Sequence, residues 1–318
     1  MVKEKPRVSV DESANPCDDV RKCLSADDEC AIIDELSTDV QALLFPLGSL
    51  QEAIISLLAD SEVVYTGLCA MIVTVFKVSD TIALKVTTNE FAVTESRTLD
   101  FLETRLPDFP APKSHGIIRF GHYYLLFTTF MGSHNLKDIW PQLDECQKRG
   151  ISTQLDSIIS RLRSLPRPDN SPFGSTASGR CLDARRGTRI SQDPITSFEQ
   201  FDDFIFSGTR YTRSTYIQFL RNFKIGVPTE CIFTHGDLHP GNIIVDQDEE
   251  GGWKVDGIID WERSGFYPAY WEAVKTINCL APMDAHNWYL YLPESVALQQ
   301  YAVEWLVDRL LDWHLKNS

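Results

Sequence analysis

The sequence predicts an α+β fold in two parts, a small N-terminal lobe with an antiparallel sheet and a larger, mostly helical C-terminal lobe. Between residues 63 and 86, short runs rich in β-branched residues predict consecutive strands. After residue 132, apolar residues recur mainly at helical intervals. A chain of 318 residues is also long enough for about two hydrophobic cores.

The N-terminal lobe is expected over residues 31–131, after a polar, acidic arm at residues 1–30 that we expect to be flexible. Its first helical segment, "ALLFPLGSLQEAIISLLA", is broken near Pro46. Strands are predicted at "EVVYTG", "AMIVTVFKV" and "TIALKV", with a turn at Ser79 and Asp80. The run "EFAVTESRTLDFLETRL" has helical periodicity, and "HYYLLFTTF" predicts one more strand.

The C-terminal lobe is expected over residues 132–318. Helices are predicted at "SHNLKDIWPQL", "QLDSIISRLRSL", "SFEQFDDFIFS", "STYIQFLRNF" and the amphipathic "SVALQQYAVEWLVDRLLDWHL". The segment around residues 171–194 is rich in Gly, Ser and Arg, and predicts a long surface loop. The run "NIIVDQDEEGGWKVDGIID" predicts a hairpin, because two apolar strands flank an acidic, glycine-containing turn.

The composition of the chain argues against several classes of binding partner. The formal net charge of −15 disfavours binding to nucleic acid and to anionic membranes. The sequence shows neither the apolar region of a secretory signal nor a run long enough to span a bilayer. Its eight cysteines are scattered without a CxxC pair, which argues against a zinc knuckle or a dense disulfide framework. We therefore expect a cytoplasmic protein with no nucleic-acid or membrane partner.

The run "FTHGDLHPGNIIVD" at residues 233–246 gathers two histidines, two aspartates and an asparagine between apolar flanks. One interpretation is a non-haem iron oxygenase site, in which His235, Asp237 and the distant His286 form a facial triad. Two observations count against it. The flanks are mostly helical, whereas such triads lie in barrels of strands, and the triad leaves Asn242 and Asp260 without a role.

A phosphoryl-transfer site uses more of these residues. Transfer of a γ-phosphoryl group needs a carboxylate near the acceptor hydroxyl, hard oxygen ligands for a divalent metal and a cation on the nucleotide phosphates. Asp237 leaves a loop, Asn242 begins the next strand, and the predicted hairpin returns Asp260 beside Asn242. The structural alternative is that Asp237 and Asn242 only close a tight loop. The joint arrangement with Asp260 favours the catalytic interpretation.

The segments "HGDLHPGN" and "GIIDWE" resemble the aminoglycoside phosphotransferase/choline kinase family, which has a protein-kinase-like, two-lobed fold. The longer run "FTHGDLHPGNIIVD" with "GIIDWERSGFYPAYWE" is similar to the fungal branch of this family. The resemblance is most specific over residues 231–273 and extends more loosely from about residue 60 to the C-terminus, including "GRCLDAR". It implies an ATP- and Mg²⁺-dependent phosphotransferase that acts on a hydroxyl group of a small molecule.

The resemblance also implies a role for each matching position. Asp237 matches the catalytic-loop aspartate that orients the acceptor hydroxyl. Asn242 and Asp260 match the two metal-binding residues of the family. His235 matches a histidine that braces the loop, whereas His239 falls at a variable position.

The N-terminal lobe is expected to bind the nucleotide. In "TIALKVT", Lys85 alternates with the most apolar residues, so its side chain is expected to point away from the apolar face. It is the candidate that binds the nucleotide phosphates. The alternative is an ordinary exposed lysine on a strand. Its expected partner is Glu95 on the following helix, with Glu90 as the second choice. Further candidates for nucleotide binding are Gly67 in the phosphate loop "VYTGLCAMIV" and the hinge residues Thr128, Thr129 and Phe130.

Two functions stay open on the sequence. An active kinase is favoured by the presence of all the polar residues that transfer requires. A catalytically idle, kinase-like protein that binds a nucleotide or another ligand is allowed by the glycine-poor phosphate loop. Glu272 stands where relatives often carry a bracing aspartate, and could take over that role. Residues that could face a cationic or aromatic acceptor are Asp202, Asp203, Asp284 and Trp288.

Overall fold

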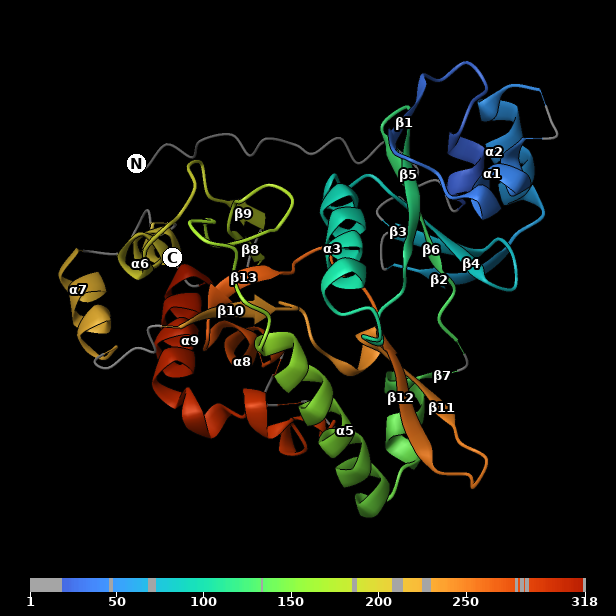
Figure 1. Cartoon of the computed structure of the whole chain (residues 1–318). Coiled ribbons are helices and arrows are strands. Elements are labelled where there is room, and N and C mark those ends of the chain that lie inside the picture. Colours follow the sequence, from blue (N-terminus) through green and yellow to red (C-terminus); the bar gives the residue numbers. More distant parts are fainter. Residues whose placement is uncertain are drawn as a thin grey trace, which may run out of the picture. The chain divides into compact units, whose positions relative to one another are not determined.

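The computed structural model describes residues 19–45, 48–67, 73–132, 134–184, 188–207, 214–224, 230–277, 280, 283 and 286–316. The chain divides into two compact units, each described here by itself (Figure 1). The first unit comprises Met1–Glu90 and His115–Thr128, and the second comprises Phe91–Ser114 and Thr129–Ser318. Of the arm expected at residues 1–30, residues 1–18 lie outside the described part. The remainder includes a short 3-10 helix, η1 (Val20–Cys23), and the flexibility of the arm stays a prediction.

The first unit is built on a six-stranded sheet with the order β1-β5-β6-β4-β3-β2. The pairs β1–β5, β2–β3 and β3–β4 are antiparallel. The predicted strands and the break of the helical segment near Pro46 are confirmed, whereas β1 was missed because its five residues alternate poorly between buried and exposed. The strands are β1 (Cys30–Asp34), β2 (Glu62–Thr66), β3 (Val73–Lys77), β4 (Ile82–Thr87), β5 (Ser114–Phe120) and β6 (Tyr123–Thr129), and the helices are α1 (Thr38–Leu44) and α2 (Leu50–Ala59).

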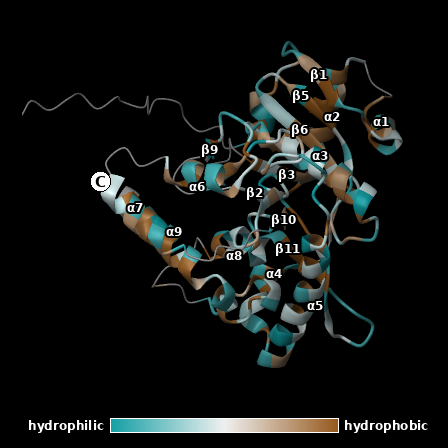
Figure 2. Cartoon of the chain, turned by 60° about the vertical axis from the view of Figure 1, so that its left-hand side comes forward, coloured by the Kyte–Doolittle hydropathy of each residue, from teal (hydrophilic) through white to brown (hydrophobic). Residues whose placement is uncertain are grey.

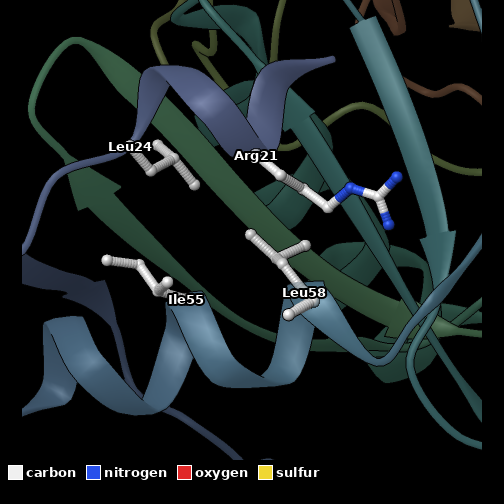
Figure 3. A pocket seen from close by; sticks show the side chains of 5 residues that line it. Arg21, Leu24, Ile55 and Leu58 are labelled. Carbon is white, nitrogen blue, oxygen red and sulfur yellow. The ribbon is translucent and has the colours of Figure 1, made fainter.

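Apolar residues of η1, α1, α2 and the sheet form one core in this unit. Figure 2 shows hydrophobic residues along α2 and neighbouring strands. Helix α2 begins at a capping box, in which Ser49 accepts the Glu52 amide and the Glu52 carboxylate accepts the Ser49 amide. A cavity of about 300 Å³ lies against Arg21, Leu24 and the α2 residues Ile55 and Leu58 (Figure 3).

The second unit contains α3 and most of the helices. Helix α5 shows why they form: Asp144 and Gln147 make a capping box, and the buried Ile151, Leu155 and Ile159 recur every four residues on one face. The helices of this unit are α3 (Phe91–Arg105), α4 (Leu136–Ile139), α5 (Glu145–Arg163), α6 (Phe198–Phe206), α7 (Ser214–Asn222), α8 (Trp271–Thr276) and α9 (Ala302–Lys316).

Three small sheets accompany these helices, with the orders β12-β11-β7, β10-β13 and β8-β9. The predicted hairpin is confirmed as β11 and β12, with Ile243 opposite Ile258. Strand β13, which pairs with β10, was missed. The strands are β7 (His134–Asn135), β8 (Leu182–Ala184), β9 (Thr188–Ile190), β10 (Cys231–Thr234), β11 (Ile243–Gln247), β12 (Trp253–Ile258) and β13 (Gly265–Pro268).

The prediction of an exposed surface loop at residues 171–194 is wrong for the central part of that segment. Cys181 and Asp183 are fully buried, and β8 pairs antiparallel with β9. The Leu182 amide donates to the Tyr267 hydroxyl at 3.0 Å, which ties this hairpin to β13. Within the described residues, no helix is both long enough and apolar enough to cross a bilayer.

Candidate active site

The loop between β10 and β11 carries Asp237 and is held at both ends. Thr234 at the end of β10 lies opposite Gly265, and the 3-10 turn η3 (Pro240–Asn242) leads the chain into β11. Gly236 has a φ of +82°, and a Cβ atom there would lie 2.6 Å from the Arg263 carbonyl oxygen. Only glycine fits such a turn without a shift of the backbone. Asp237 follows directly, with a side chain that is 19% exposed.

His235 fixes the conformation of this loop through both ring nitrogens. Its Nδ1 accepts the Asp237 amide at 3.2 Å, and its Nε2 lies 3.0 Å from the Ile259 carbonyl oxygen. A carbonyl can only accept, so Nε2 carries the proton and the ring is neutral. Burial holds the pKa of His235 below its usual range, which favours the same neutral form. The oxygenase interpretation is therefore wrong, because neither nitrogen of His235 is left to bind iron.

His239 also has a local role. Its Nδ1 accepts the Gly241 amide at 3.0 Å at the start of η3, and its Nε2 lies 4.0 Å from Asp237 Oδ2. The ring therefore stabilises the turn that follows Asp237.

Glu272 braces the loop from α8. Its Oε2 accepts the His235 amide at 2.6 Å, and its Oε1 accepts the Gly236 amide at 3.2 Å. The side chain is 1% exposed, so these two amides have no access to water as an alternative partner. The expectation that Glu272 takes the bracing position is confirmed by these contacts.

Glu272 makes stability depend on pH. Burial is the largest effect and raises the pKa of Glu272 to about 7, against the opposing hydrogen bonds from His235 and Gly236. Between its unperturbed value of 4.5 and about 7, the folded state binds the extra proton, so the free energy of unfolding falls as pH rises. We expect wild type to lose up to about 3 kcal/mol across this window relative to Glu272→Gln. Urea denaturation at several pH values measures both slopes, and equal slopes would contradict the shifted pKa.

The hairpin brings Asn242 and Asp260 together as predicted. The Ile259 amide donates to the Asn242 carbonyl at 3.0 Å, which leaves Asp260 one residue further along. Asn242 Nδ2 donates to the Asp237 carbonyl at 3.0 Å, so the side-chain oxygen is the atom that Asn242 can offer to a metal. Asp260 has a φ of +67°, a left-handed conformation that aspartate tolerates better than most residues.

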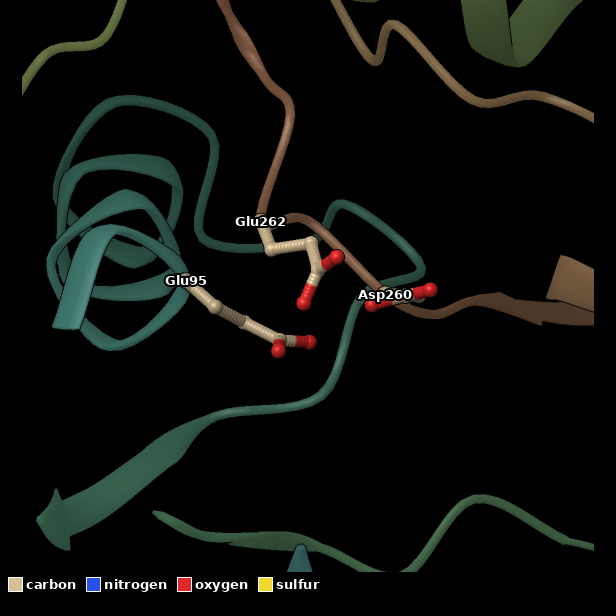
Figure 4. A group of neighbouring side chains, drawn as sticks. All are labelled: Glu95, Asp260 and Glu262. Atoms are coloured by element: carbon tan, nitrogen blue, oxygen red, sulfur yellow. The ribbon is translucent and has the colours of Figure 1, made fainter. Parts of the chain in front are cut away.

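Three carboxylates converge next to this hairpin. Oxygens of Glu95, Asp260 and Glu262 all lie within 4.8 Å of one another (Figure 4). Glu95 comes from α3 and is 4% exposed, and its Oε1 also accepts the Trp261 amide at 3.2 Å. Hard oxygens in this number fit Mg²⁺, whose charge would offset their mutual repulsion. The sequence had predicted Asp260 as a metal ligand, had left open whether Glu262 binds a metal or only caps local structure, and had assigned Glu95 to Lys85.

Arg263 is a residue of the site that the sequence reasoning missed. Its Nη1 lies 3.0 Å from Asp237 Oδ1, and its Nε lies 4.0 Å from Glu262 Oε1. The backbone approach between Gly236 and Arg263 places the guanidinium beside Asp237. The available signal was a cation directly after "DWE", but its partner lies 26 positions earlier in the chain.

The remaining nucleotide-binding candidates lie mainly in the first unit. Lys85 is half-buried in β4, and its neighbours Ala83 and Thr87 are buried, so the alternation is weaker than expected. The Gly67 amide donates to the Val73 carbonyl at 2.9 Å, across residues 68–72 that lie outside the described part. The expected pairing of Lys85 with Glu95 stays a prediction.

The hinge candidates are Thr128, Thr129 and Phe130, all of which are half-buried. The Thr129 amide already donates to the Lys113 carbonyl at 3.0 Å, and the Lys113 amide donates to Thr129 Oγ1 at 3.2 Å. A nucleotide base would therefore have to use the main-chain groups of the neighbouring residues.

The residues considered for a cationic or aromatic acceptor are engaged elsewhere. Asp202 pairs with Lys224, and Asp203 pairs with Arg221 at 2.6 Å. Trp288 is 1% exposed and packs against Trp140 at a centroid distance of 5.1 Å, so the expectation that it faces an acceptor is wrong. Asp284 lies outside the described residues.

Comparison with known proteins identifies the class to which this fold and loop belong. Residues 80–314 match the model of the phosphotransferase enzyme family. None of the curated proteins matches the chain in sequence. The aminoglycoside phosphotransferase APH(2")-IIa, solved with streptomycin and ATP, is 13% identical, with a TM-score of 0.50 over 82% of this chain and 84% of its own.

Two further solved structures are similar to the chain. APH(3'')-Id from Streptomyces rimosus is 16% identical, with a TM-score of 0.46 over 83% of this chain and 97% of its own. A putative fructosamine-3-kinase from Haemophilus somnus is 13% identical, with a TM-score of 0.48 over 81% and 85%. The similarity to APH(2")-IIa shows an α+β, protein-kinase-like fold. The family match covers most of the chain, and the protein belongs to the phosphotransferase enzyme family.

Proposed function

We propose that the protein is an ATP- and Mg²⁺-dependent phosphotransferase that transfers the γ-phosphoryl group to a hydroxyl of a small molecule. The observation that carries this proposal is the assembly of Asp237, Asn242 and Asp260 on one braced loop and hairpin. Phosphoryl transfer depends mainly on positioning and on electrostatic stabilisation, and a rigid loop suits both. We also propose that the chain belongs to the fungal branch of the family, because the run "GIIDWERSGFYPAYWE" is similar to that branch.

Asp237 acts on the acceptor. Its carboxylate would accept a hydrogen bond from the acceptor hydroxyl, orient the attacking oxygen and take its proton during transfer. The amides of His235 and Gly236 are held by Glu272, so the loop does not have to reorganise when the acceptor binds.

Asn242 and Asp260 would hold the metal, and Glu262 offers a further oxygen next to them. When bound, Mg²⁺ would offset negative charge on the nucleotide phosphates. Lys85 would add a cation at the α- and β-phosphates, with Glu95 as its orienting partner. Gly67 and the segment Thr128 to Phe130 complete the nucleotide site in this proposal.

Binding of Mg²⁺ and ATP provides the test of this site. Nucleotide at about 100 times its dissociation constant should add roughly 2.7 kcal/mol to the free energy of unfolding. We expect this stabilisation with Mg²⁺ and ATP together, and a large part of it to be lost on addition of EDTA. Asp260→Asn should lose it as well, because asparagine tolerates the left-handed backbone but removes the charged ligand.

Thermal denaturation with and without Mg²⁺-ATP measures these differences. Asp256→Asn is a matched control, since Asp256 lies on β12, shortly before Asp260, and does not belong to the cluster of Glu95, Asp260 and Glu262. Equal stabilisation of wild type and Asp260→Asn would contradict the metal assignment. Stabilisation by Mg²⁺-ATP without any turnover would instead favour the idle, nucleotide-binding alternative.

A further inference from the structure

A small cavity of the second unit lies directly beside Asp237. Its volume is about 40 Å³, which is room for roughly three water molecules. Side chains from β8 and α8 supply apolar walls. The charged residues that line it are Asp237, Arg263 and Lys275. Two of these three carry a positive charge.

Lys275 belongs to a buried group of ion pairs. Its Nζ lies 2.6 Å from Asp183 Oδ1, and Arg189 Nη2 lies 2.6 Å from Asp183 Oδ2. Asp183 is fully buried between these two cations. The Lys275 ammonium also lies 4.2 Å from the centre of the Trp271 ring. A negative group that enters the cavity would therefore be attracted by the cationic side chains of Lys275 and Arg263, which both line it.

Arg263 forms the opposite wall and is the more adaptable of the two cations. Its side chain is 34% exposed, and it directs Nη1 at Asp237 Oδ1. A guanidinium has five N–H donors in a planar fork, so it can bind a second anion while it stays beside Asp237. An acceptor with its own anionic group would bind the other N–H donors of Arg263, which places its hydroxyl near Asp237.

The charges that line the cavity disfavour a cationic acceptor. It would meet the like charges of Arg263 and Lys275, and the single carboxylate on the cavity wall is already paired. The overall charge of −15 does not change this local balance, because salt screens charges beyond about 8–10 Å.

We propose that the acceptor is a small hydroxyl compound that carries a compact anionic group, a carboxylate or a phosphate, which Arg263 binds next to Asp237. This inference rests on the proposed phosphotransferase function. It replaces the cationic acceptor that the sequence had suggested, and it makes Arg263 the residue that determines substrate specificity.

Binding of malonate tests the anion site without turnover. Malonate is a compact dianion without a hydroxyl group, and tetramethylammonium is its cationic counterpart. We expect malonate to bind wild type, and Arg263→Gln to raise its dissociation constant about 10-fold or more, since a charge-assisted contact is lost. Arg161→Gln, at an exposed arginine of α5, should bind malonate as wild type does. Equal malonate affinity in wild type and Arg263→Gln, or a preference for tetramethylammonium, would overturn the proposal.

Turnover separates this proposal from the function on which it rests. Glycerate and glycerol 2-phosphate are compared with uncharged glycerol and cationic choline as acceptors for Mg²⁺-ATP. We expect the ratio of kcat/KM for glycerate to kcat/KM for glycerol to fall about 10-fold or more in Arg263→Gln. If the substitution also disturbs Asp237, both acceptors lose activity equally and this ratio does not change. Phosphorylation of choline in preference to glycerate would overturn the anionic acceptor and leave the phosphotransferase intact. Arg263-dependent malonate binding without any phosphorylated product would support the anion site and contradict the function.

Discussion

Replacing Asp237 by asparagine is expected to lower the kcat of phosphoryl transfer by about 10²- to 10⁴-fold. The amide has nearly the same shape as the carboxylate, but it cannot take a proton from the acceptor hydroxyl. The contacts that fix the loop use the main-chain groups of Asp237, so they persist in the variant. ADP release coupled to a spectrophotometric assay measures the change.

Asp246→Asn is the matched control for this experiment. Asp246 is an exposed aspartate of β11 in the same hairpin, and its Oδ1 accepts the amide of Gln247. The control should turn over as wild type does. A kcat of Asp237→Asn within twofold of wild type, at unchanged thermal stability, would remove Asp237 from the reaction.

Replacing Glu272 by alanine is expected to have the largest effect on stability. Two buried amides, those of His235 and Gly236, would lose their acceptors. Each unsatisfied buried donor costs about 1–3 kcal/mol, so the free energy of unfolding should fall by roughly 2–6 kcal/mol. This is a large fraction of the roughly 5–15 kcal/mol typical of a folded protein. Urea denaturation near pH 5, where the folded state keeps Glu272 protonated, gives the value without the cost of burying the ionised carboxylate.

Glu250→Ala provides the comparison, since Glu250 lies exposed in the turn between β11 and β12. That substitution should change the free energy of unfolding by less than about 0.5 kcal/mol. A loss at Glu272 as small as that at Glu250 would mean that the loop does not depend on the carboxylate. Because the same amides position Asp237, Glu272→Ala should also slow turnover in whatever fraction stays folded.

The parts of the site that could be predicted are those set by local sequence. The hairpin of β11 and β12 follows from two apolar runs around an acidic, glycine-containing turn, and its register alone brings Asp260 beside Asn242. The glycine at position 236 could likewise be expected from the sequence to mark a tight turn, and the structure shows that this turn leaves no space for a Cβ atom. Such features need no knowledge of the rest of the chain.

The parts that could not be predicted depend on contacts between distant segments. Asp183 lies in a stretch whose Gly, Ser and Arg content is typical of an exposed loop, yet it is buried by its ion pairs with Arg189 and Lys275. Asp183 and Lys275 are 92 positions apart in the chain, and no local sequence pattern would pair them. The pairing of Arg263 with Asp237 escaped prediction for the same reason.

Glu95 illustrates a third case, in which the helix was predicted but part of the surroundings of the side chain was not. The helical periodicity predicted α3, and burial of Ala92, Leu99 and Leu102 confirms its apolar face. The sequence alone placed Glu95 opposite Lys85, which stays a prediction, but it did not reveal that Glu95 also accepts the Trp261 amide and lies beside the carboxylates of Asp260 and Glu262. Only the fold of the segment after β12 brings these acidic groups together.

Transfer of the γ-phosphoryl group from ATP to a hydroxyl compound is the central claim, and it can be measured directly. The protein is incubated with Mg²⁺, ATP labelled in the γ-phosphoryl group and a library of small hydroxyl compounds, and the products are separated by mass spectrometry. The account predicts a labelled phosphate ester that forms with wild type, is lost with EDTA and falls at least 100-fold with Asp237→Asn. Equal product formation by wild type and Asp237→Asn, or no labelled ester from a wild type that Mg²⁺-ATP stabilises, would contradict it.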